Sequence, residues 1–226
     1  MRRFVNKSKI SSDKQGFLII LSAPSGCGKT TILSRLVKRH PDWVRSVSVT
    51  TRPKRLEEKE GRDYEFVTAR KFEALKQGKE FLEWARIFDH QYGTLRKGVE
   101  EGVQKGRIVI LTVDIQGNRS IRRAVGKRVS ALSIFILPPS ISILRERLEK
   151  RSMDSAEEIE KRIQRAEEEI KAAREYDATV INHDLDQTTH EIETLVSEFE
   201  KKLTSFMSQG QGGKGNGLHS ARKAHA

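Results

Sequence analysis

The sequence lacks the features that mark secreted and membrane proteins. Its single cysteine, Cys27, excludes an internal disulfide and is typical of a reducing compartment. The longest apolar run, at 17–23, is far shorter than the roughly 20 apolar residues that a membrane-spanning helix needs. The basic start MRRFVNKSKISS is not followed by the apolar stretch of a signal peptide, which favours a disordered leader, with a transit peptide as the alternative. We therefore expect a cytoplasmic protein without a membrane partner.

Positive charge is in excess, but it is unevenly placed. The formal net charge is +12, of which residues 1–15 contribute +4 and residues 208–226 contribute +3. The segment 208–226 is rich in glycine and has no apolar period, so we predict a disordered basic tail, matched by a disordered basic leader at 1–15. The remaining charge of about +5 on 16–207 indicates anionic substrates and no nucleic-acid partner for the folded part. Nucleic-acid binding through the two ends stays an alternative.

Apolar patterning predicts an α/β fold. Short apolar runs bounded by turn residues predict strands at 17–23, 46–50, 108–113, 131–137 and 178–181. Helical periodicity predicts helices at 30–39, 69–77, 95–104, 141–150, 156–175 and 188–206. Strands rich in valine, isoleucine and leucine that alternate with helices indicate a parallel sheet covered by helices on both faces.

Two regions depart from this alternation. Residues 52–92 are polar with scattered aromatic side chains, and they are too long for a simple connection, so we predict an inserted subdomain. In 145–170, Ser155 and Glu158 form a capping-box pattern at the start of a helix. Its apolar stripe consists only of Ile159, Ile163, Ala166 and Ile170. Such a lightly anchored helix is able to move.

The stretch SAPSGCGKTT, 22–31, nearly spells the phosphate-binding pattern G-x-x-x-x-G-K-[ST], with Ala23 in place of the first glycine. It follows a predicted strand and opens a predicted helix, where backbone N–H groups and the helix dipole favour an anion. Gly26 and Gly28 allow the backbone to approach a phosphate, and Ala23 is tolerable if its φ is negative. The alternative is a glycine-rich turn with an incidental lysine.

The loop also supplies the candidate residues for ATP. Lys29 would reach the β- and γ-phosphates, and the Thr30 hydroxyl would bind Mg²⁺. The helix N-terminus next to Cys27 would lower the pKa of its thiol, although packing explains this cysteine equally well. The candidate ATP-binding residues are Ala23, Pro24, Ser25, Gly26, Cys27, Gly28, Lys29, Thr30 and Thr31. The loop does not identify the phosphate acceptor.

A second cluster suggests an acceptor with a phosphate group. Arg52, Arg55 and Tyr64 fall within 46–67, and with Tyr92 they would bind a phosphate monoester, because the planar guanidinium suits such an anion. A solvated basic loop explains these residues equally well.

The order and spacing of the motifs resemble those of the guanylate kinase family over about 16–207. The motifs are APSGCGKTT, SVSVTTR, GRDYEFV, FLEWA with YGT, VDIQG, PPS with RLEKR, and VINHDLD. The resemblance implies a P-loop NTPase-type sheet and transfer of phosphate from ATP to GMP, and also dGMP, with Mg²⁺ as cofactor. It further implies a core (16–49, 93–136 and 171–207), a GMP-binding subdomain (50–92) and a helical lid (137–170).

The resemblance also implies the GMP-binding residues. Ser48 and Glu83 would recognise the base with help from Thr94, since one carboxylate accepts both adjacent N–H donors of guanine and adenine has no such pair. The GMP phosphate would be bound by Arg52, Arg55, Tyr64 and Tyr92. The sequence departs from the family pattern in two places. The proline of TTRPKR comes one position early. Thr112 replaces the first acidic residue of a D-x-D element, whose second acidic residue, Asp114, would also contact GMP. Without the flanking motifs, a surface charge beside Trp84 would explain Glu83 equally well.

The implied catalytic residues are Lys29 and three arginines of the lid, Arg147, Arg151 and Arg162. These arginines would spread the charge of the transferring group; as a structural alternative, they pair with carboxylates on a solvated helix. No general base is needed because the attacking phosphate oxygen of GMP is already anionic. Asn182 in VINHD would lie near the adenine of ATP.

Two other functions stay open. A guanylate-kinase-like module without catalysis would use the same cleft to bind a phosphorylated peptide, although such a module has no use for Lys29 or for the lid arginines. A kinase of the same fold would act on another phosphorylated small molecule. We expect a monomer or a homodimer.

Overall fold

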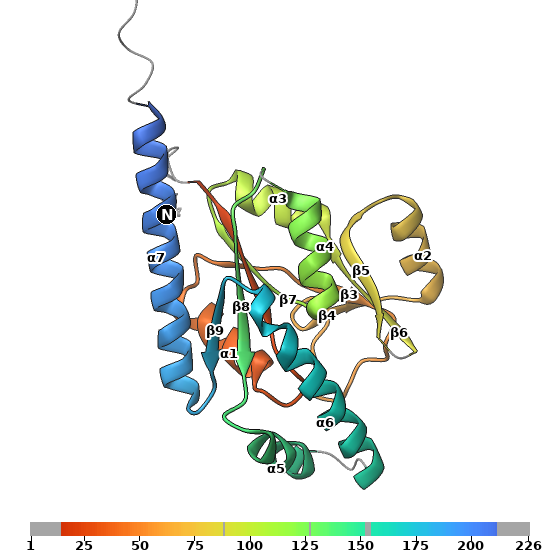
Figure 1. Cartoon of the computed structure of the whole chain (residues 1–226). Helices are drawn as coiled ribbons and strands as arrows, with labels where there is room; N and C mark the ends of the chain where they lie inside the picture. Colours follow the sequence, from red (N-terminus) through yellow and green to blue (C-terminus); the bar gives the residue numbers. More distant parts are fainter. Residues whose placement is uncertain (1–14, 88, 127, 152–154, 212–226) are drawn as a thin grey trace, which may run out of the picture.

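The larger of two sheets forms the centre of the molecule (Figure 1). The computed structural model describes residues 15–87, 89–126, 128–151 and 155–211. The larger sheet contains β1 (Phe17–Ser22), β2 (Val44–Arg45), β7 (Ile108–Thr112), β8 (Ala131–Leu137) and β9 (Ala178–Ile181). Its strands lie in the order β2-β7-β1-β8-β9, and each neighbouring pair is parallel. The predicted α/β fold with a parallel sheet is confirmed.

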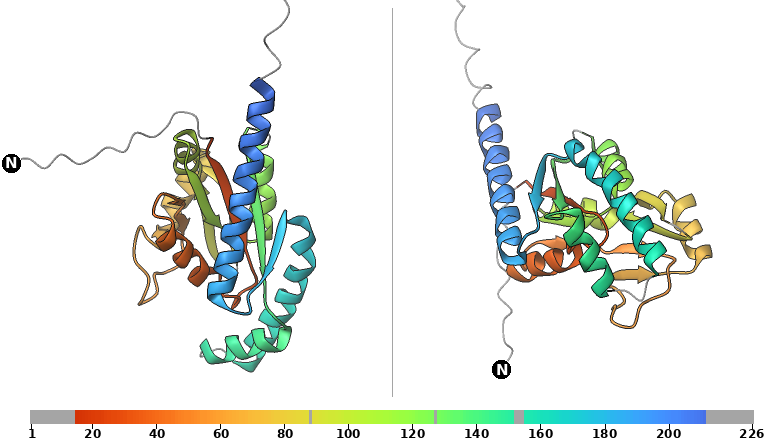
Figure 2. Two further views of the ribbon diagram at one scale, coloured as in Figure 1. Left: turned by 90° about the vertical axis from the view of Figure 1, so that its left-hand side faces the viewer. Right: turned by 60° about the horizontal axis from the view of Figure 1, so that its bottom comes forward.

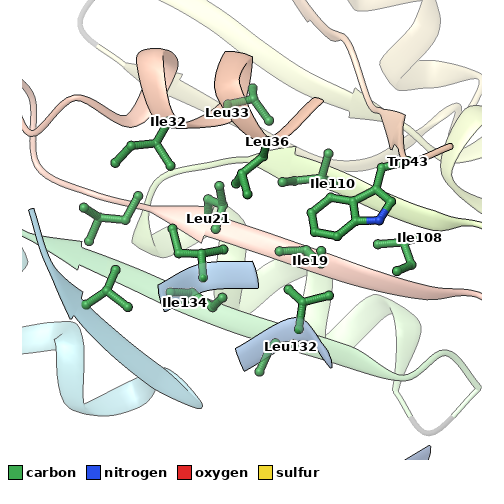
Figure 3. Close-up of a cluster of buried hydrophobic side chains, with 14 of the residues drawn as sticks. Ile19, Leu21, Ile32, Leu33, Leu36, Trp43, Ile108, Ile110, Leu132 and Ile134 are labelled. Atoms are coloured by element: carbon green, nitrogen blue, oxygen red, sulfur yellow. The ribbon is translucent and has the colours of Figure 1, made fainter. Parts of the chain in front are cut away.

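Helices cover both faces of this sheet, as its alternating side chains require. Phe17, Ile19 and Leu21 of β1 pack in a cluster with α1 (Lys29–Arg39) and α7 (Leu185–Gln211), as Figure 3 shows for much of this cluster. Leu18 and Ile20 point to the other face, where they pack with α3 (Arg96–Gln104) and α4 (Ile115–Val125). Every residue of β1 is buried. A strand buried on both faces explains the continuous apolar run in the sequence.

A smaller sheet has its own core. It contains β3 (Ser48–Thr50), β4 (Tyr64–Phe66), β5 (Phe81–Ile87) and β6 (His90–Leu95), in the order β4-β3-β6-β5. The helix α2 (Ala69–Gln77) contributes Phe72, whose ring packs against that of Phe81 with centroids 4.6 Å apart and planes tilted by 30°. Both rings cluster with the buried Val49. Because this sheet begins at Ser48 and ends at Leu95, it extends beyond both bounds of the predicted subdomain 50–92.

One helix lies beyond the carboxyl end of β8, and a second runs back from it toward the start of β9 (Figure 2). These are α5 (Ile141–Arg151) and α6 (Ala156–Lys171), and a 3-10 turn, η1 (Ala172–Glu175), follows. The capping box of Ser155 and Glu158 is formed, as predicted. Between α5 and α6 lies a small apolar cluster that also contains Cys27 of the phosphate loop. The predicted lid therefore packs on the loop through this cluster.

Several predicted elements differ from the observed ones. The strand predicted at 46–50 is shorter and belongs to the smaller sheet, whereas the edge strand of the larger sheet is the unpredicted β2. The unpredicted helix α4 has few apolar residues, because its exposed face is polar and only its inner face is buried. The helix α7 runs to Gln211, so the segment predicted as disordered from 208 begins in a helix. The rest of that segment and residues 1–14 lie outside the described residues.

Candidate active site

The phosphate loop, 23–28, joins β1 to α1. Gly26 has φ 90° and Gly28 has φ 81°, so both lie in the left-handed region that favours glycine. Among the residues that the structure describes, Lys79 is the only non-glycine with positive φ, so the expectation that Ala23 needs none is confirmed. Alanine therefore replaces the first glycine of the pattern without backbone strain.

Lys29 and Thr30 occupy the first turn of α1, directly after the loop. Lys29 is partly buried and Thr30 is exposed. Burial lowers the pKa of the Lys29 ammonium, while the carboxylates of Glu169 and Asp114 act in the opposite direction. A desolvated cation beside a loop of this geometry favours an anionic ligand.

Cys27 faces inward rather than toward a ligand. Its side chain is fully buried in the apolar cluster with Leu144 and Leu148 of α5. Burial raises the pKa of the thiol to about 12, despite the nearby charges of Arg147 and Lys29. The expected lowering of the pKa by the helix N-terminus is therefore wrong, because desolvation outweighs it.

Three predicted base-binding residues lie side by side in the smaller sheet. Thr94 of β6 pairs with Ser48 of β3 on one side and with Glu83 of β5 on the other. The Thr94 hydroxyl donates a hydrogen bond of 2.6 Å to Glu83 Oε1. Glu83 is only 8% exposed, which argues against the alternative of a surface charge. Burial raises the pKa of its carboxyl to about 7, and the charge of Asp114 acts in the same direction.

The predicted phosphate-binding residues form a second group, on β4, β6 and the loop after β3. The Arg52 guanidinium lies 5.5 Å from the centre of the Tyr64 ring. The rings of Tyr64 and Tyr92 meet edge to face with centroids 5.9 Å apart. The side chain of Arg55 is exposed. Arginine and tyrosine donors thus gather on the loop and strands that flank Ser48.

Sequence reasoning missed Glu58, which organises this group. Its Oε1 accepts a 2.6 Å hydrogen bond from Arg52 Nη2, and its Oε2 accepts a 2.9 Å hydrogen bond from the backbone N–H of Arg55. One carboxylate thereby binds the side chain of Arg52 and the backbone of Arg55. Because the loop sequence LEEKE offers several carboxylates, nothing in the sequence singles out Glu58.

Asp114 lies between the two halves of the site. It caps the N-terminus of α4 by accepting a 2.7 Å hydrogen bond from the Gly117 N–H. Its charge acts on both Lys29 and Glu83, so it lies close to both. Because β7 neighbours β1, Asp114 and the phosphate loop lie at the same edge of the larger sheet, and Glu83 lies near Asp114. Thr112, the replaced acidic residue, is the last residue of β7.

The predicted lid arginines are placed differently from one another. Arg147 Nη2 donates a 3.1 Å hydrogen bond to the backbone carbonyl of Asn182. Arg162 is partly buried on α6. Arg151 is the last residue of α5, and its side chain lies outside the described part of the structure. The side chain of Asn182 is 2% exposed and donates to the Cys27 carbonyl, so it faces the loop from inside the protein.

The residues around Thr30 fit a magnesium ion bound together with ATP. Among the described residues, no group of three or more His, Cys, Asp or Glu side chains is placed to hold a metal ion. Mg²⁺ commonly takes one or two protein ligands and completes its shell with phosphate oxygens and water. An exposed hydroxyl beside the loop satisfies that requirement.

In the described part of the chain, no helix is both long and apolar enough to cross a membrane.

A parallel sheet with this loop at the carboxyl end of β1 defines the chain as a P-loop nucleotide-binding protein of the kinase type. Within that class, the family model "Guanylate kinase" matches residues 15–199. The chain belongs to the guanylate kinase family.

Individual relatives agree with this assignment. The chain is 44% identical to a guanylate kinase of Bradyrhizobium diazoefficiens, over 81% of this chain and 83% of that protein. It is 43% identical to a guanylate kinase of Wolbachia sp. subsp. Brugia malayi, over 82% of this chain and 94% of that protein. The crystal structure of guanylate kinase from Anaplasma phagocytophilum superposes with a TM-score of 0.69 at 32% identity and covers 83% of this chain and 88% of that one.

Proposed function

We propose that this chain transfers the γ-phosphoryl group of ATP to GMP or dGMP, giving ADP and the corresponding diphosphate. The observation that supports this best is the buried carboxylate of Glu83, placed beside Thr94 and close to Asp114. Asp114 is in turn close to Lys29 of the phosphate loop. The carboxylate that would select the base thus lies on the same side of the sheet as the loop that would bind phosphates, with Asp114 close to both.

Guanine would be held by Glu83 and Ser48. The Glu83 carboxylate accepts hydrogen bonds from N1–H and N2–H of the base, and the Ser48 hydroxyl adds a third contact. Adenine lacks this pair of donors and would leave the buried carboxylate with no hydrogen bond from the base, at a cost of about 1 to 3 kcal/mol or more. The Thr94 hydroxyl, already bonded to Glu83 Oε1, keeps the carboxylate in position.

The phosphate of GMP would be held by the group around Glu58. Arg52 and Arg55 neutralise its charge, and the hydroxyls of Tyr64 and Tyr92 donate hydrogen bonds. Binding at both ends fixes the orientation of the nucleotide, so that a phosphate oxygen points toward the phosphate loop.

ATP would be held by the residues 23–31. Backbone N–H groups of the loop and the Lys29 ammonium bind the β- and γ-phosphates. The Thr30 hydroxyl would hold Mg²⁺, which neutralises phosphate charge when it is bound.

The transfer itself requires no general base. An anionic oxygen of GMP attacks the γ-phosphorus, the bond from this phosphorus to the β–γ bridging oxygen breaks, and ADP leaves with the electron pair. Lys29 and the lid arginines Arg147, Arg151 and Arg162 stabilise the charge that develops on the transferring group. Closure of the lid over the site excludes water and limits hydrolysis of ATP.

A substrate panel tests this proposal. Purified protein with Mg·ATP is assayed for ADP release with GMP, dGMP, AMP, UMP and ribose 5-phosphate, and Lys29→Ala serves as the inactive control. We expect ADP release with GMP and dGMP only. ADP release no higher than in the control would favour the binding module, and a preference for AMP would contradict the role of Glu83. A cytoplasmic location, the oligomeric state and the lack of a nucleic-acid partner stay predictions.

A further inference from the structure

We propose that Asn182 is a positioning residue that fixes the orientation of one peptide group in the phosphate loop and links this loop to Arg147 of the lid. The inference rests on the proposed function for its kinetic consequences. It assigns to the Asn182 side chain a role that differs from the contact with adenine implied by resemblance.

Asn182 is itself held rigidly. It directly follows β9, and its backbone N–H donates a 2.9 Å hydrogen bond to the carbonyl of Leu137, the last residue of β8. Its side chain is 2% exposed. The Thr188 hydroxyl lies 3.2 Å from Asn182 Oδ1 and has its shortest contact, 2.6 Å, with the Asp184 carbonyl. Burial and the fixed backbone therefore leave the amide little freedom to move.

The other end of this amide holds the phosphate loop. Asn182 Nδ2 donates a 2.8 Å hydrogen bond to the carbonyl of Cys27. In a trans peptide the carbonyl and the following N–H point in opposite directions. When the Cys27 carbonyl is held against Asn182, the Gly28 N–H points away from Asn182, toward the side where a phosphate binds.

This peptide group needs an external constraint because it is flanked by glycine. Gly28 has φ 81°, and glycine alone does not prevent the peptide from turning over. A turned peptide would present the Cys27 carbonyl oxygen to the phosphate and repel it. A Cβ atom on Gly28 would lie 2.8 Å from Asn182 Nδ2, which shows how closely the amide packs under the loop.

The backbone of the same residue reaches the lid. Arg147 Nη2 donates a 3.1 Å hydrogen bond to the carbonyl oxygen of Asn182. One residue thus holds the loop through its side chain and a lid arginine through its backbone. We expect Asn182 substitutions to weaken triphosphate binding while leaving the GMP half of the site intact.

The test compares Asn182→Ala and Asn182→Asp with His183→Ala. Asp preserves the shape but removes the donor to the Cys27 carbonyl, and His183 is an exposed neighbour that serves as the matched control. Calorimetry measures binding of ATP, inorganic tripolyphosphate and GMP, each alone. Kinetics measure kcat and the KM for each substrate, and NMR follows the Gly28 amide resonance during titration with tripolyphosphate.

We expect both Asn182 variants to bind ATP and tripolyphosphate about tenfold more weakly, as for the loss of one well-placed hydrogen bond. GMP binding should stay close to that of His183→Ala, measured below the melting temperature of each variant because loss of a buried hydrogen bond lowers that temperature. The Gly28 resonance should shift less than in the parent. Weaker binding of ATP with unchanged binding of tripolyphosphate would overturn the inference in favour of an adenine contact. An equal loss for GMP, or no loss at all, would also overturn it. If the parent protein lacks kinase activity, the proposed function fails, but the binding and NMR measurements still decide the role of Asn182.

Discussion

At the scale of single residues, the site depends on a carboxylate that folding makes difficult to ionise. Glu83 is buried, and the pKa of its carboxyl is raised to about 7. In the proposed function, its ionised form accepts both N–H donors of guanine. Burial would then disfavour the carboxylate in the free protein and the substrate would favour it, a usual conflict between stability and function.

The affinity for GMP should depend on pH through Glu83. Because the carboxylate form binds, affinity should rise about tenfold between pH 6 and pH 8, as the carboxyl ionises near pH 7. Glu83→Gln should bind GMP more weakly at pH 8 and lose most of this dependence, while the titration of the GMP phosphate itself remains. Calorimetric titrations at the two pH values provide the measurement. An unchanged pH dependence in Glu83→Gln would contradict the assignment.

The same pKa has a consequence for stability. Because the folded-state pKa of Glu83 lies above the ordinary value of 4.5, the folded protein retains a proton that the unfolded chain loses between about pH 4.5 and 7. The favourable contribution is fully present below pH 4.5 and is lost as the pH rises through 7. Glu83→Gln should therefore raise the melting temperature more at pH 8 than at pH 5, as measured by calorimetry.

Glu58 provides another test at the scale of residues. Replacing it by glutamine removes the charge that holds the Arg52 side chain and weakens its bond to the Arg55 backbone. We expect the KM for GMP to rise severalfold with a small change in kcat, because the lost interaction acts on binding. The exposed neighbour Glu57, substituted in the same way, is the control. Steady-state kinetics that show equal effects for the two variants would exclude a special role for Glu58.

At the scale of elements, the lid and the phosphate loop share one small apolar core. Ile159 and Ile163 of α6 are buried against Leu144, Leu148 and Cys27, apart from the main clusters. The sequence identified this helix as lightly anchored from its short apolar stripe. It could not identify the partner, since the contact with Cys27 joins segments that are far apart in the chain.

Truncation of this core should loosen the lid before it unfolds the protein. Ile163→Ala removes buried methyl groups, which costs about 2 to 5 kcal/mol in a packed site. We expect faster hydrogen exchange in α5 and α6, with much less change in β1 and β8. Ile192→Ala in the main core is the control and should accelerate exchange throughout. Equal patterns in the two variants would show that lid and core unfold as one unit.

At the scale of the whole molecule, the two halves of the proposed site come from different sheets. The larger sheet presents the phosphate loop at the carboxyl end of β1, and the smaller sheet presents Ser48, Glu83 and Thr94. Asp114 at the start of α4 lies near both halves. We therefore expect the two substrates to be held independently before the proposed lid brings its arginines to them.

The charge of the whole chain provides the last prediction. More than half of the net charge of +12 lies in 1–15 and 208–226. A chain reduced to 15–211 should elute from an immobilised DNA column at a clearly lower salt concentration, because fewer cations contact phosphates. Its kcat/KM for GMP should stay within about twofold of the full chain, as the charge removed lies outside the predicted site. Elution at the same salt concentration as the full chain would contradict the prediction and show that the folded domain binds the DNA.

The sequence by itself determined four of the five strands of the larger sheet, the phosphate loop and the family. The continuous apolar run of β1 indicates a strand that is buried on both faces. Gly26 and Gly28 indicate a loop with left-handed backbone. Both features can be recognised from a few consecutive residues. Only the tertiary structure decided the roles of Glu58, Cys27 and Asn182. Each of these depends on a partner that the local pattern does not indicate: an arginine beyond the loop turn, the lid helices, and a peptide group 155 residues away in the chain. Hydrogen bonds and burial of this kind are set by the packing of elements, which no local pattern encodes.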